Sequence, residues 1–557
     1  STRGARKSTA YPFVHSSSII IGKMTIIELE CTNGYAVDFR APRVDRTAYH
    51  SVGKVVGYER TDAILRNWHR SHSSIDLLTK EIMKYDKKLP SRPIDPAYSM
   101  SLHTVIRDFT CETKLTPLSS GAIPKHRDFP RNKSPGLPWT QRQYKTKEAV
   151  CTDPTAWAEM QKQWDLIGRG KAITLPDCLT YQRIIACKKP KEKVRPVWGY
   201  PTSVIVEEGR FFYPWIEWMK NRSDDHCYGI GLETALGGLR YIDMMNTQHH
   251  TARGSTIAGF DWSEFDTTVP AWLIRDAFSV LKMCFRMDQI QSSDGRIWPV
   301  DARESERRWR RLIHYFINTT ILLPNGRRFK KNMGVPSGSM FTNVIDTICN
   351  AIVTRYCCFH TSAYLPLGDV YFGDDVYAIV RRPFDVEIYA RLAYERFGMR
   401  LNLQKSIITD DATAVPFLGF YNFQGRPRRS LDFLFASYMI PEHTVTNHFE
   451  TACRALGHLY STMYGPHAYI WYKILKEVQF YASVESNEIE TYIRNNYNRR
   501  FKYLKNLGFT PDEIGVPDHR VDEFFKIVDC VEPFKGPTRA YQKRRTWLNT
   551  NMVYAWP

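Results

Sequence analysis

The sequence predicts an α+β fold. Segments with helical spacing and segments rich in β-branched and aromatic residues are mixed along the whole chain. Two such β-rich runs are joined by a tight turn within residues 367–380, whereas from about residue 441 onward the apolar residues recur at helical spacing. The 557 residues exceed the roughly 250 to 300 at which a single core usually divides, so we expect several packed subdomains.

Charge and cysteine content narrow the class of protein. The chain has 77 Lys and Arg against 58 Asp and Glu, a formal net charge of +19, which favours a polyanionic partner such as nucleic acid. Its 12 cysteines form no C-x-x-C pair, so we expect thiols in a reducing compartment rather than disulfides or a zinc site. The apolar run Ile19–Ile21 is far shorter than the roughly 20 residues of a membrane helix, so no membrane partner is expected.

A hairpin that carries two carboxylates is the first candidate site. Residues 367–380 read LGDVYFGDDVYAIV, in which Gly373–Asp375 joins two β-rich runs. Gly-Asp turns are common at surfaces, and the Asp-Asp pairs at 224–225 and 410–411 have no apolar runs around them, so we interpret both as surface turns. The pair at 374–375 is instead predicted to lie between strands of one sheet.

A second carboxylate segment precedes that hairpin. Residues 256–266 read TIAGFDWSEFD, a short strand that ends at Asp261, with Asp266 following just before the helix start signals Thr268 and Pro270. We expect this strand to lie beside the hairpin, so that the aspartates form one cluster. Carboxylates that meet in this way repel one another without cations, and two Mg²⁺ ions about 3.5 to 4 Å apart would supply the missing charge.

The segment between these two reads GVPSGSMFTNVIDTICN, residues 334–350. Its glycines predict a loop whose backbone can approach a ligand closely, followed by a helix from about Met340 to Cys357. Thr342 and Asp346 are four residues apart and share one helix face. Such a polar stripe is usually the solvated side of a helix, but the loop in front of it and its place between the carboxylate segments favour a face that contacts a ribose.

These segments, in this order, resemble motifs A, B and C of viral RNA-dependent RNA polymerases. Motif A corresponds to Asp261 and Asp266, motif B to Ser337, Gly338 and Thr342, and motif C to Gly373–Asp375. The wording of DWSEFDTTVPAWLIRDAF, GVPSGSMFTNVID and VRPVWGYP is most similar to polymerases of partitiviruses, which are double-stranded RNA viruses, with picobirnavirus enzymes next. The resemblance covers roughly residues 130–430.

The resemblance implies a role for each matched residue. Asp261, Asp374 and Asp375 would be catalytic and would bind the metal, Mg²⁺ with Mn²⁺ as a substitute, and Lys405 resembles the motif D lysine that protonates departing pyrophosphate. The residues expected to bind the nucleotide are Lys188, Lys189, Lys191, Lys193 and Arg195 of the motif F type, and Asp266, Ser337, Gly338, Thr342 and Asp346. A solvated surface is the alternative for the basic run, and the neighbouring motifs favour phosphate binding.

Asp346 departs from the wider polymerase pattern, which has asparagine four residues after the motif B threonine. An asparagine can donate a hydrogen bond to Asp266, whereas a second ionised carboxylate cannot. The pair therefore requires a shared proton, a cation or a hydroxyl group between its members. The partitivirus-like enzymes resemble this chain at the position, which we interpret as a variant of sugar selection.

Other segments resemble polymerase motifs less specifically. Ser134–Pro138 resembles motif G at the template entrance, and Phe417–Phe420 with the arginines after it resembles the motif E hairpin that grips the product strand. An ordinary turn and an ordinary surface hairpin are the alternatives. Further candidates for RNA contacts are Arg307, Arg308, Arg310, Arg311, Arg426, Arg428, Arg429 and Lys543–Arg545.

The resemblance also implies an architecture, a closed right hand with fingers, a palm built on an RRM-like antiparallel sheet, and a helical thumb. Residues 1–110 would form an N-terminal extension that bridges fingers and thumb. We expect fingers at 111–205 and 276–330, palm at 206–275 and 331–440, and the thumb with a C-terminal segment at 441–557.

The implied function is RNA-templated RNA synthesis, in transcription and replication of a double-stranded RNA virus genome. Expected partners are template and product RNA, NTPs and a viral capsid protein, within the virion or the host cytoplasm. One alternative is a reverse transcriptase-like polymerase, which typically has an aromatic steric gate where this chain has Asp266. Another is a non-catalytic RNA-binding or capsid-associated protein, which would not need the three aspartates together.

Overall fold

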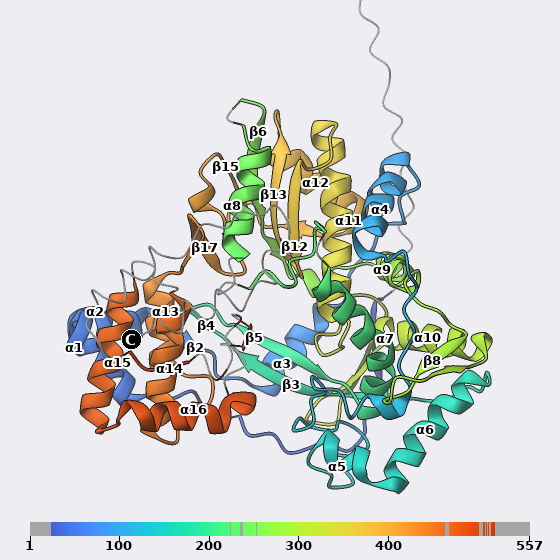
Figure 1. The fold of residues 1–557 in the computed structure, drawn as a ribbon, viewed down its shortest axis with the longest axis horizontal. Coiled ribbons are helices and arrows are strands. Elements are labelled where there is room, and N and C mark those ends of the chain that lie inside the picture. The colour runs from blue at the N-terminus through green and yellow to red at the C-terminus, as the bar shows by residue number, and fades with distance from the viewer. Residues whose placement is uncertain are drawn as a thin grey trace, which may run out of the picture.

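The computed structural model describes residues 24–500, apart from 40, 223, 234–237, 252 and 463–466, and a few positions between 505 and 517. It confirms the α+β prediction, because two main β-sheets are enclosed by helices and a group of helices lies beside them (Figure 1). Lys543–Arg545, a candidate RNA contact, lies outside the described residues.

A four-stranded sheet carries the candidate carboxylates, and all its neighbouring strands are antiparallel. In spatial order the strands are β12 (Gly368–Phe372), β13 (Asp375–Arg381), β6 (Ser255–Phe260) and β15 (Ile407–Thr409). Alternate residues of β13 enter two different cores: Ala378 joins the core around helix α11 (Thr342–Ser362), and Ile379 joins the core of the C-terminal helices. Because both faces are buried, a one-residue slip of register would be costly.

The second sheet has five strands, of which β10 and β3 are parallel and the other neighbours antiparallel. In spatial order they are β1 (Ile26–Leu29), β11 (Arg328–Lys331), β10 (Thr320–Leu322), β3 (Cys178–Ile184) and β5 (Val194–Gly199). A turn at residues 324–326 joins β10 to β11. Gly326 there has a φ of 87°, in the left-handed region that glycine adopts readily, and donates its N–H to Leu323 O at 3.0 Å.

Shorter strands form smaller sheets. The pairs are β2 (Trp68–Arg70) with β4 (Ala186–Lys188), β7 (Trp262–Ser263) with β14 (Arg400–Leu401), β8 (Gln289–Gln291) with β9 (Ile297–Pro299), and β17 (Phe420–Phe423) with both β16 (Pro416–Phe417) and β18 (Arg426–Arg428). Helix α2 (Tyr58–Asn67) ends where Trp68–Arg70 begins to pair with β4.

Helices surround both sheets. Those before the C-terminal group, besides α2 and α11, are α1 (Arg46–Val56), α3 (Ile75–Met83), α4 (Pro96–Phe109), α5 (Lys147–Thr152), α6 (Pro154–Gly168), α7 (Thr202–Asn221), α8 (Gly238–His249), α9 (Ala271–Lys282), α10 (Ala302–Ile317) and α12 (Val386–Phe397). Helix α11 packs against α4, α9, α12 and both strands of the carboxylate hairpin, so it is a central support of the site.

The C-terminal part is helical as predicted. It comprises α13 (Leu431–Met439), α14 (His448–Ser461), α15 (Ala468–Ala482) and α16 (Ser486–Arg500). Helix α1 packs on α13 and α15, although it lies near the other end of the chain (Figure 1). Because α3 packs on β5 and α4 on α11, the N-terminal part touches both the C-terminal helices and the sheet region.

Two further predictions concern the whole chain. The cysteines that the structure describes carry free thiols, and most are buried, as expected of core residues. Among the described helices, none is both long enough and apolar enough to cross a membrane.

Candidate active site

The hairpin of Asp374 and Asp375 forms as predicted. Strands β12 and β13 pair antiparallel up to Phe372 opposite Asp375, so that Gly373 and Asp374 make the turn. Gly373 has a φ of 64°, which a residue with a side chain adopts only with strain. Both residues are accessible to solvent at this tip, although the carboxyl of Asp375 is largely surrounded by protein groups. The pairs at 224–225 and 410–411 lie at exposed surface turns outside any hairpin, as predicted, and Asp410 forms an ion pair with Arg382.

Asp261 lies at the same end of the sheet as the hairpin tip. It follows β6, whose last residue, Phe260, is opposite Val376 of β13. The turn that bears Lys405 holds the backbone of Asp261 from both sides, because Asp261 N–H donates to Ser406 Oγ at 3.0 Å and Asn402 N–H donates to Asp261 O at 2.7 Å. The strand order therefore brings together carboxylates that are far apart in the sequence.

The three carboxylates repel one another in the protein without a cation. Burial raises the pKa of Asp375 to about 7, with further increases from the charges of Asp374 and Asp261. Burial also raises the pKa of Asp261; Lys405 opposes this shift, and Asp374 adds to it. Such a cluster of hard oxygen donors has the chemistry that Mg²⁺ prefers.

The carboxylates do not form a closed metal cage. Among the described residues, no group of three or more His, Cys, Asp or Glu side chains is arranged to hold a metal ion by itself. Mg²⁺ commonly keeps several waters and takes one or two carboxylates together with phosphate oxygens of a substrate. The donor set therefore fits an ion that is completed by a nucleotide, and Asp261, Asp374 and Asp375 remain the predicted ligands.

Cations gather beside the carboxylates. The pKa of Lys193 is lowered by burial and then by the charges of Arg195, Lys191 and Lys405. Lys191 and Lys193 also act on the carboxyl of Asp261. The predicted phosphate-binding segment thus reaches the carboxylate cluster with these three residues, Lys191, Lys193 and Arg195.

The first two lysines of that segment are placed differently. The ammonium group of Lys188 lies 5.7 Å from the ring centre of Trp68, and Lys189 donates its backbone N–H to Asn67 O at 2.8 Å. Both residues lie where β4 meets β2. Their predicted contact with a nucleotide stays a prediction.

The loop of Ser337 and Gly338 is held by its neighbours in the fold. Val335 N–H donates to Asp266 O at 2.7 Å, and Trp198 N–H of β5 donates to Ser337 O at 3.0 Å. A Cβ atom on Gly338 would lie 1.8 Å from Trp198 O, so only glycine fits there. Helix α11 begins at Thr342 and ends at Ser362 rather than covering Met340–Cys357, and Thr342 Oγ1 donates to Pro336 O at 2.8 Å.

The surroundings of Asp266 and Asp346 indicate which of the two carboxyl groups favours protonation. Asp346 is only 5% exposed, and burial raises its pKa well above the ordinary value, followed by the charges of Asp266 and Asp374 and by a hydrogen bond to Asp266. The hydrogen bond from Asp346 opposes the burial-driven rise in the pKa of Asp266, as does a stronger one from Ser337 Oγ. Because burial and the neighbouring carboxylates all raise its pKa, Asp346 is the member of the pair that favours the protonated form, in which it could donate to Asp266 as an asparagine would.

Two buried charged residues at this loop were missed from the sequence. Glu208 of α7 accepts hydrogen bonds from Ser339 Oγ and, at 3.2 Å, from Met340 N–H, and burial raises its pKa to about 8. Lys331 donates from Nζ to Gly334 O at 3.0 Å and Ile317 O at 2.9 Å. Neither has a local pattern that marks it, because Lys331 follows Lys330 and reads as part of an exposed basic strand.

The candidate RNA contacts fare unevenly. Arg308 was wrong as a surface contact, because it forms hydrogen bonds of 2.8 and 2.6 Å with Glu207, which is 1% exposed. A buried carboxylate needs such a partner, so this arginine stabilises the packing of α10 on α7. Arg428 and Arg429 lie over aromatic rings of Phe423 and Phe420 at 4.8 and 4.9 Å.

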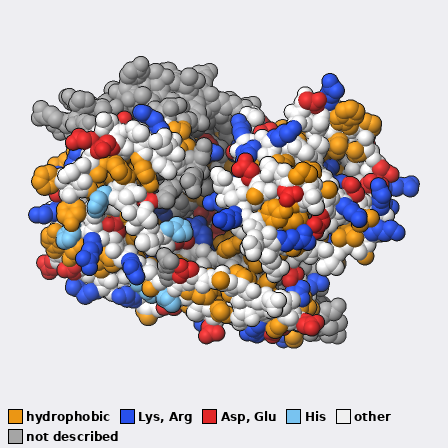
Figure 2. All heavy atoms as spheres, turned by 90° about the horizontal axis from the view of Figure 1, so that it is seen from below, with side chains coloured by type: hydrophobic (Ala, Val, Ile, Leu, Met, Phe, Trp, Pro, Cys, Tyr) orange, Lys and Arg blue, Asp and Glu red, His pale blue; other side chains and the backbone are white. Residues whose placement is uncertain are grey.

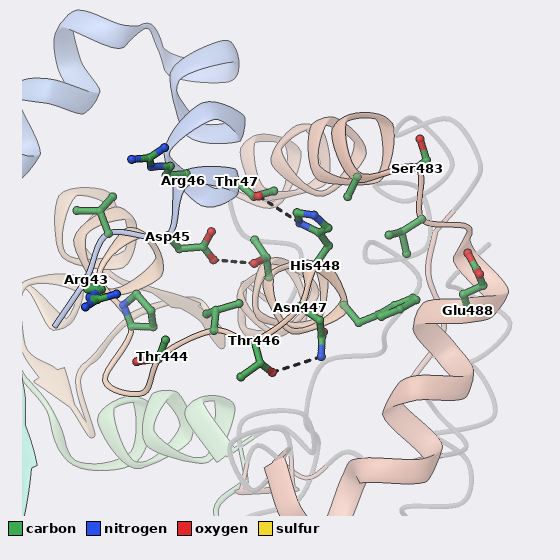
Figure 3. A pocket seen from close by; sticks show the side chains of 17 residues that line it. Arg43, Asp45, Arg46, Thr47, Thr444, Thr446, Asn447, His448, Ser483 and Glu488 are labelled. Carbon is green, nitrogen blue, oxygen red and sulfur yellow. Dashed lines mark hydrogen bonds between the residues drawn. The ribbon is translucent and has the colours of Figure 1, made fainter. Parts of the chain in front are cut away.

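Two views show features outside the carboxylate cluster. The face in Figure 2 carries lysine and arginine side chains across its width, mixed with acidic ones, so the net positive charge is not gathered into one patch there. A cavity of about 670 Å³ lies between the starts of α1 and α14, where Thr47 and His448 face each other at 3.3 Å (Figure 3). Its lining contains none of the predicted site residues.

Comparison with known proteins identifies relatives that match most of the chain. A family profile described as viral RNA-dependent RNA polymerase matches residues 48–430. The RNA-directed RNA polymerase of Cryptosporidium parvum virus 1 is 27% identical over 385 residues, 63% of this chain and 66% of that protein. That of White clover cryptic virus 1 is 21% identical over 457 residues, 75% of this chain and 67% of that protein. The chain thus spans about two thirds of the length of these two relatives.

A solved structure shares the fold. The RNA-dependent RNA polymerase of a human picobirnavirus aligns with a TM-score of 0.55 and 15% sequence identity, over 86% of this chain and 90% of that one. This likeness shows the fold, and together with the two viral relatives it confirms the resemblance found in the motifs.

Proposed function

The chain belongs to the viral RNA-dependent RNA polymerase family, and on that premise we propose that it synthesises RNA on an RNA template, in transcription and replication of a double-stranded RNA virus genome. One observation carries the proposal: Asp261 directly follows β6 beside the hairpin of Asp374, and basic residues from two other segments act on the same carboxylates. The family assignment favours neither a reverse transcriptase nor a non-catalytic RNA-binding protein.

The proposed reaction is nucleotidyl transfer. The 3′-hydroxyl of the growing RNA loses its proton and attacks the α-phosphate of an NTP, a new P–O bond forms, and the bond to pyrophosphate breaks. Two Mg²⁺ ions, or Mn²⁺ ions, at Asp261 and Asp374 with Asp375 as an auxiliary ligand would supply the positive charge that lowers the pKa of the hydroxyl and offsets charge on the phosphate.

The basic residues would serve the triphosphate in that reaction. Lys191, Lys193 and Arg195 would neutralise it. The charges of Lys191 and Lys193 act on Asp261, and that of Arg195 acts on Asp266 and Asp375, which supports this role. Lys405, whose charge also acts on Asp261, would protonate the departing pyrophosphate. Lys188 and Lys189 would extend the same phosphate-binding segment.

The ribose would be read by the residues on the other side of the cluster. Ser337 Oγ donates to the carboxylate of Asp266, a protonated Asp346 would donate to it as well, and Thr342 lies one helical turn before Asp346 on α11. We propose that Asp266 accepts a hydrogen bond from the 2′-hydroxyl of the ribose, which a deoxyribose lacks.

Asp346→Asn is expected to keep selection of rNTP over dNTP and to change its pH dependence. In the unaltered protein the donor is present below the pKa of Asp346 and is lost as the pH rises through that value, whereas an amide donates at every pH. Asp346→Leu should lower the rNTP preference by about tenfold, the cost of one hydrogen bond to a charged group. The measurement is the ratio of kcat/KM for rNTP and dNTP over the whole pH range in which the protein is active; an equal decline with rising pH in the Asn variant would contradict the shared-proton arrangement.

The right-hand subdivision follows from the same premise. We propose that the four-stranded sheet with α11 and α12 is the palm, within residues 206–275 and 331–440, and that residues 111–205 and 276–330 form the fingers. The helices after residue 441 would be the thumb. The N-terminal part would bridge fingers and thumb, which its contacts with α13, α15 and β5 support.

The implied partners are template and product RNA, NTPs and a viral capsid protein, and the implied location is the virion interior or the host cytoplasm. The carboxylate and basic groups account for NTPs and RNA. The capsid contact rests on the resemblance of the motifs to polymerases of double-stranded RNA viruses alone.

An incorporation assay tests the function directly. The chain, an RNA template, Mg²⁺ and labelled rNTPs are expected to yield labelled RNA complementary to the template, and EDTA should abolish the product. The assay is run with and without primer, and with dNTPs in place of rNTPs. Equal use of dNTPs would favour the reverse transcriptase, and RNA binding without any incorporation would favour the non-catalytic protein.

A further inference from the structure

A second row of polar residues on α11 is buried. Asn343, Thr347, Asn350 and Thr354 recur at helical spacing, next to the row of Thr342 and Asp346. The last three of the four are 0% exposed. Buried polar groups of this kind need hydrogen-bond partners. Those of Thr347 and Asn350 lie on the carboxylate hairpin and at Trp262, the residue after Asp261.

The row holds the turn of the hairpin through main-chain atoms. Gly373 N–H donates to Thr347 Oγ1 at 2.8 Å. The Asn350 amide donates from Nδ2 to both Gly373 O and Asp374 O, each at 3.0 Å. These bonds fix the backbone from which the Asp374 side chain projects, and they leave that side chain itself free to face a ligand.

The same amide also reaches the segment of Asp261. Trp262, the next residue, donates its indole N–H to Asn350 Oδ1 at 3.0 Å, and Thr354 Oγ1 donates to the same oxygen at 3.1 Å. An indole nitrogen can only donate, so the orientation of the Asn350 amide is determined. All hydrogen-bonding groups of the side chain are thereby satisfied.

These contacts matter because strand pairing ends before the carboxylates. The ladder between β6 and β13 stops at Phe260 opposite Val376, so Asp261 and Asp374 both lie beyond its last pair. The distance between the two carboxylates therefore depends on the contacts that hold the two segments extending past the last strand pair, the one with Asp261 and the one with Asp374. Asn350 forms hydrogen bonds with the backbone of Asp374 and with the side chain of Trp262, which follows Asp261.

We propose that Asn350 is a positioning residue that sets the separation of Asp261 and Asp374, and with it the affinity of the pocket for divalent metal. The inference rests on the proposed function for its metal, but it concerns contacts of this chain alone. Partners that orient metal ligands typically change metal affinity by roughly 10- to 100-fold when they are removed.

The test is metal binding by the full chain without substrates. Asn350→Asp keeps the size of the side chain and its acceptors for Trp262 and Thr354, but an ionised carboxylate has no donor for the two hairpin carbonyls. Mn²⁺ binding, followed by water-proton relaxation, is expected to weaken roughly 10- to 100-fold. Thr347→Val, which removes the acceptor of Gly373 N–H, is the second variant and should weaken binding in the same direction.

The matched control is Thr354→Val. It is equally buried on the same helix and loses bonds to Asn350 and Tyr389, but both Asn350 donors to the hairpin remain. Its Mn²⁺ affinity should stay within about twofold of the unaltered chain, even where its melting temperature falls as far as that of Asn350→Asp. Equal Mn²⁺ affinity in all folded variants would overturn the proposal, whereas absence of RNA synthesis by the unaltered chain, with metal binding intact, would overturn the proposed function alone.

Discussion

Asp374→Ala is expected to reduce RNA synthesis by about a thousandfold or more, whereas Asp375→Ala should reduce it far less. Metal ions contribute several kcal/mol to such reactions, and each 1.4 kcal/mol, roughly, is a factor of ten in rate. Asp374 is the carboxylate at the centre of the cluster, since its charge raises the pKa of Asp261, Asp266, Asp346 and Asp375. It also lies at the tip of the turn, whereas Asp375 is already part of β13.

The comparison is made at saturating rNTP and Mg²⁺ on one RNA template. Asp411→Ala serves as a control, because Asp411 also belongs to an Asp-Asp pair and lies at an exposed turn outside the site. It should keep near-normal incorporation. Because Asp374 is exposed, its loss should leave the melting temperature unchanged or raise it slightly. Near-normal RNA synthesis by Asp374→Ala would remove the metal-binding role from this hairpin.

The parts of the site that could be predicted are those with local patterns. The hairpin of Asp374 needs only two β-rich runs and a Gly-Asp turn, and the strand of Asp261 needs only its apolar residues and the helix start after it. The order of the motifs then indicated that these segments meet. The structure places them at the same end of one sheet, as expected.

The supporting residues could not be predicted, because their partners are distant in the sequence. Asn350 and Thr347 lie on a helix, where polar residues usually face solvent, and the main-chain groups that they bind belong to a turn more than twenty residues later. The carboxyl of Glu208 similarly meets a loop over a hundred residues away. Hydrogen bonds of this kind leave no periodicity in the sequence, and they become visible only when the fold is known.

The net charge of the chain was likewise insufficient to predict the role of each basic residue. A net charge of +19 indicated a polyanionic partner, but it did not separate cations that face a ligand from those that stabilise the protein. Arg308 was assigned to RNA and instead neutralises buried Glu207. Arg355, which had no assignment, forms internal ion pairs with Asp108 and Asp369.

Arg355→Met is expected to lower the free energy of unfolding by about 3 to 5 kcal/mol, the usual cost of removing one partner of a buried ion pair. Arg355 of α11 is 6% exposed and donates to Asp369 of β12 at 2.8 and 3.1 Å and to Asp108 of α4 at 2.6 Å. Its loss would leave two carboxylates buried without a cation. Burial opposes the charge of Arg355, but Asp369 and then Asp108 more than compensate and raise its pKa.

Arg142→Met is the matched control for this prediction. Arg142 forms an equally well-aligned pair with Glu159, at 2.7 and 3.1 Å, but the two side chains are 49% and 39% exposed. Surface pairs contribute about 0 to 1 kcal/mol, so urea unfolding of this variant should be nearly unchanged. Adding Asp108→Asn and Asp369→Asn to Arg355→Met should recover part of the lost stability, because the amides remain hydrogen-bonding groups without buried charge. If both arginine variants lost the same stability, burial would not be the reason that Arg355 matters, and the connection between α11, β12 and α4 would have to depend on apolar packing alone.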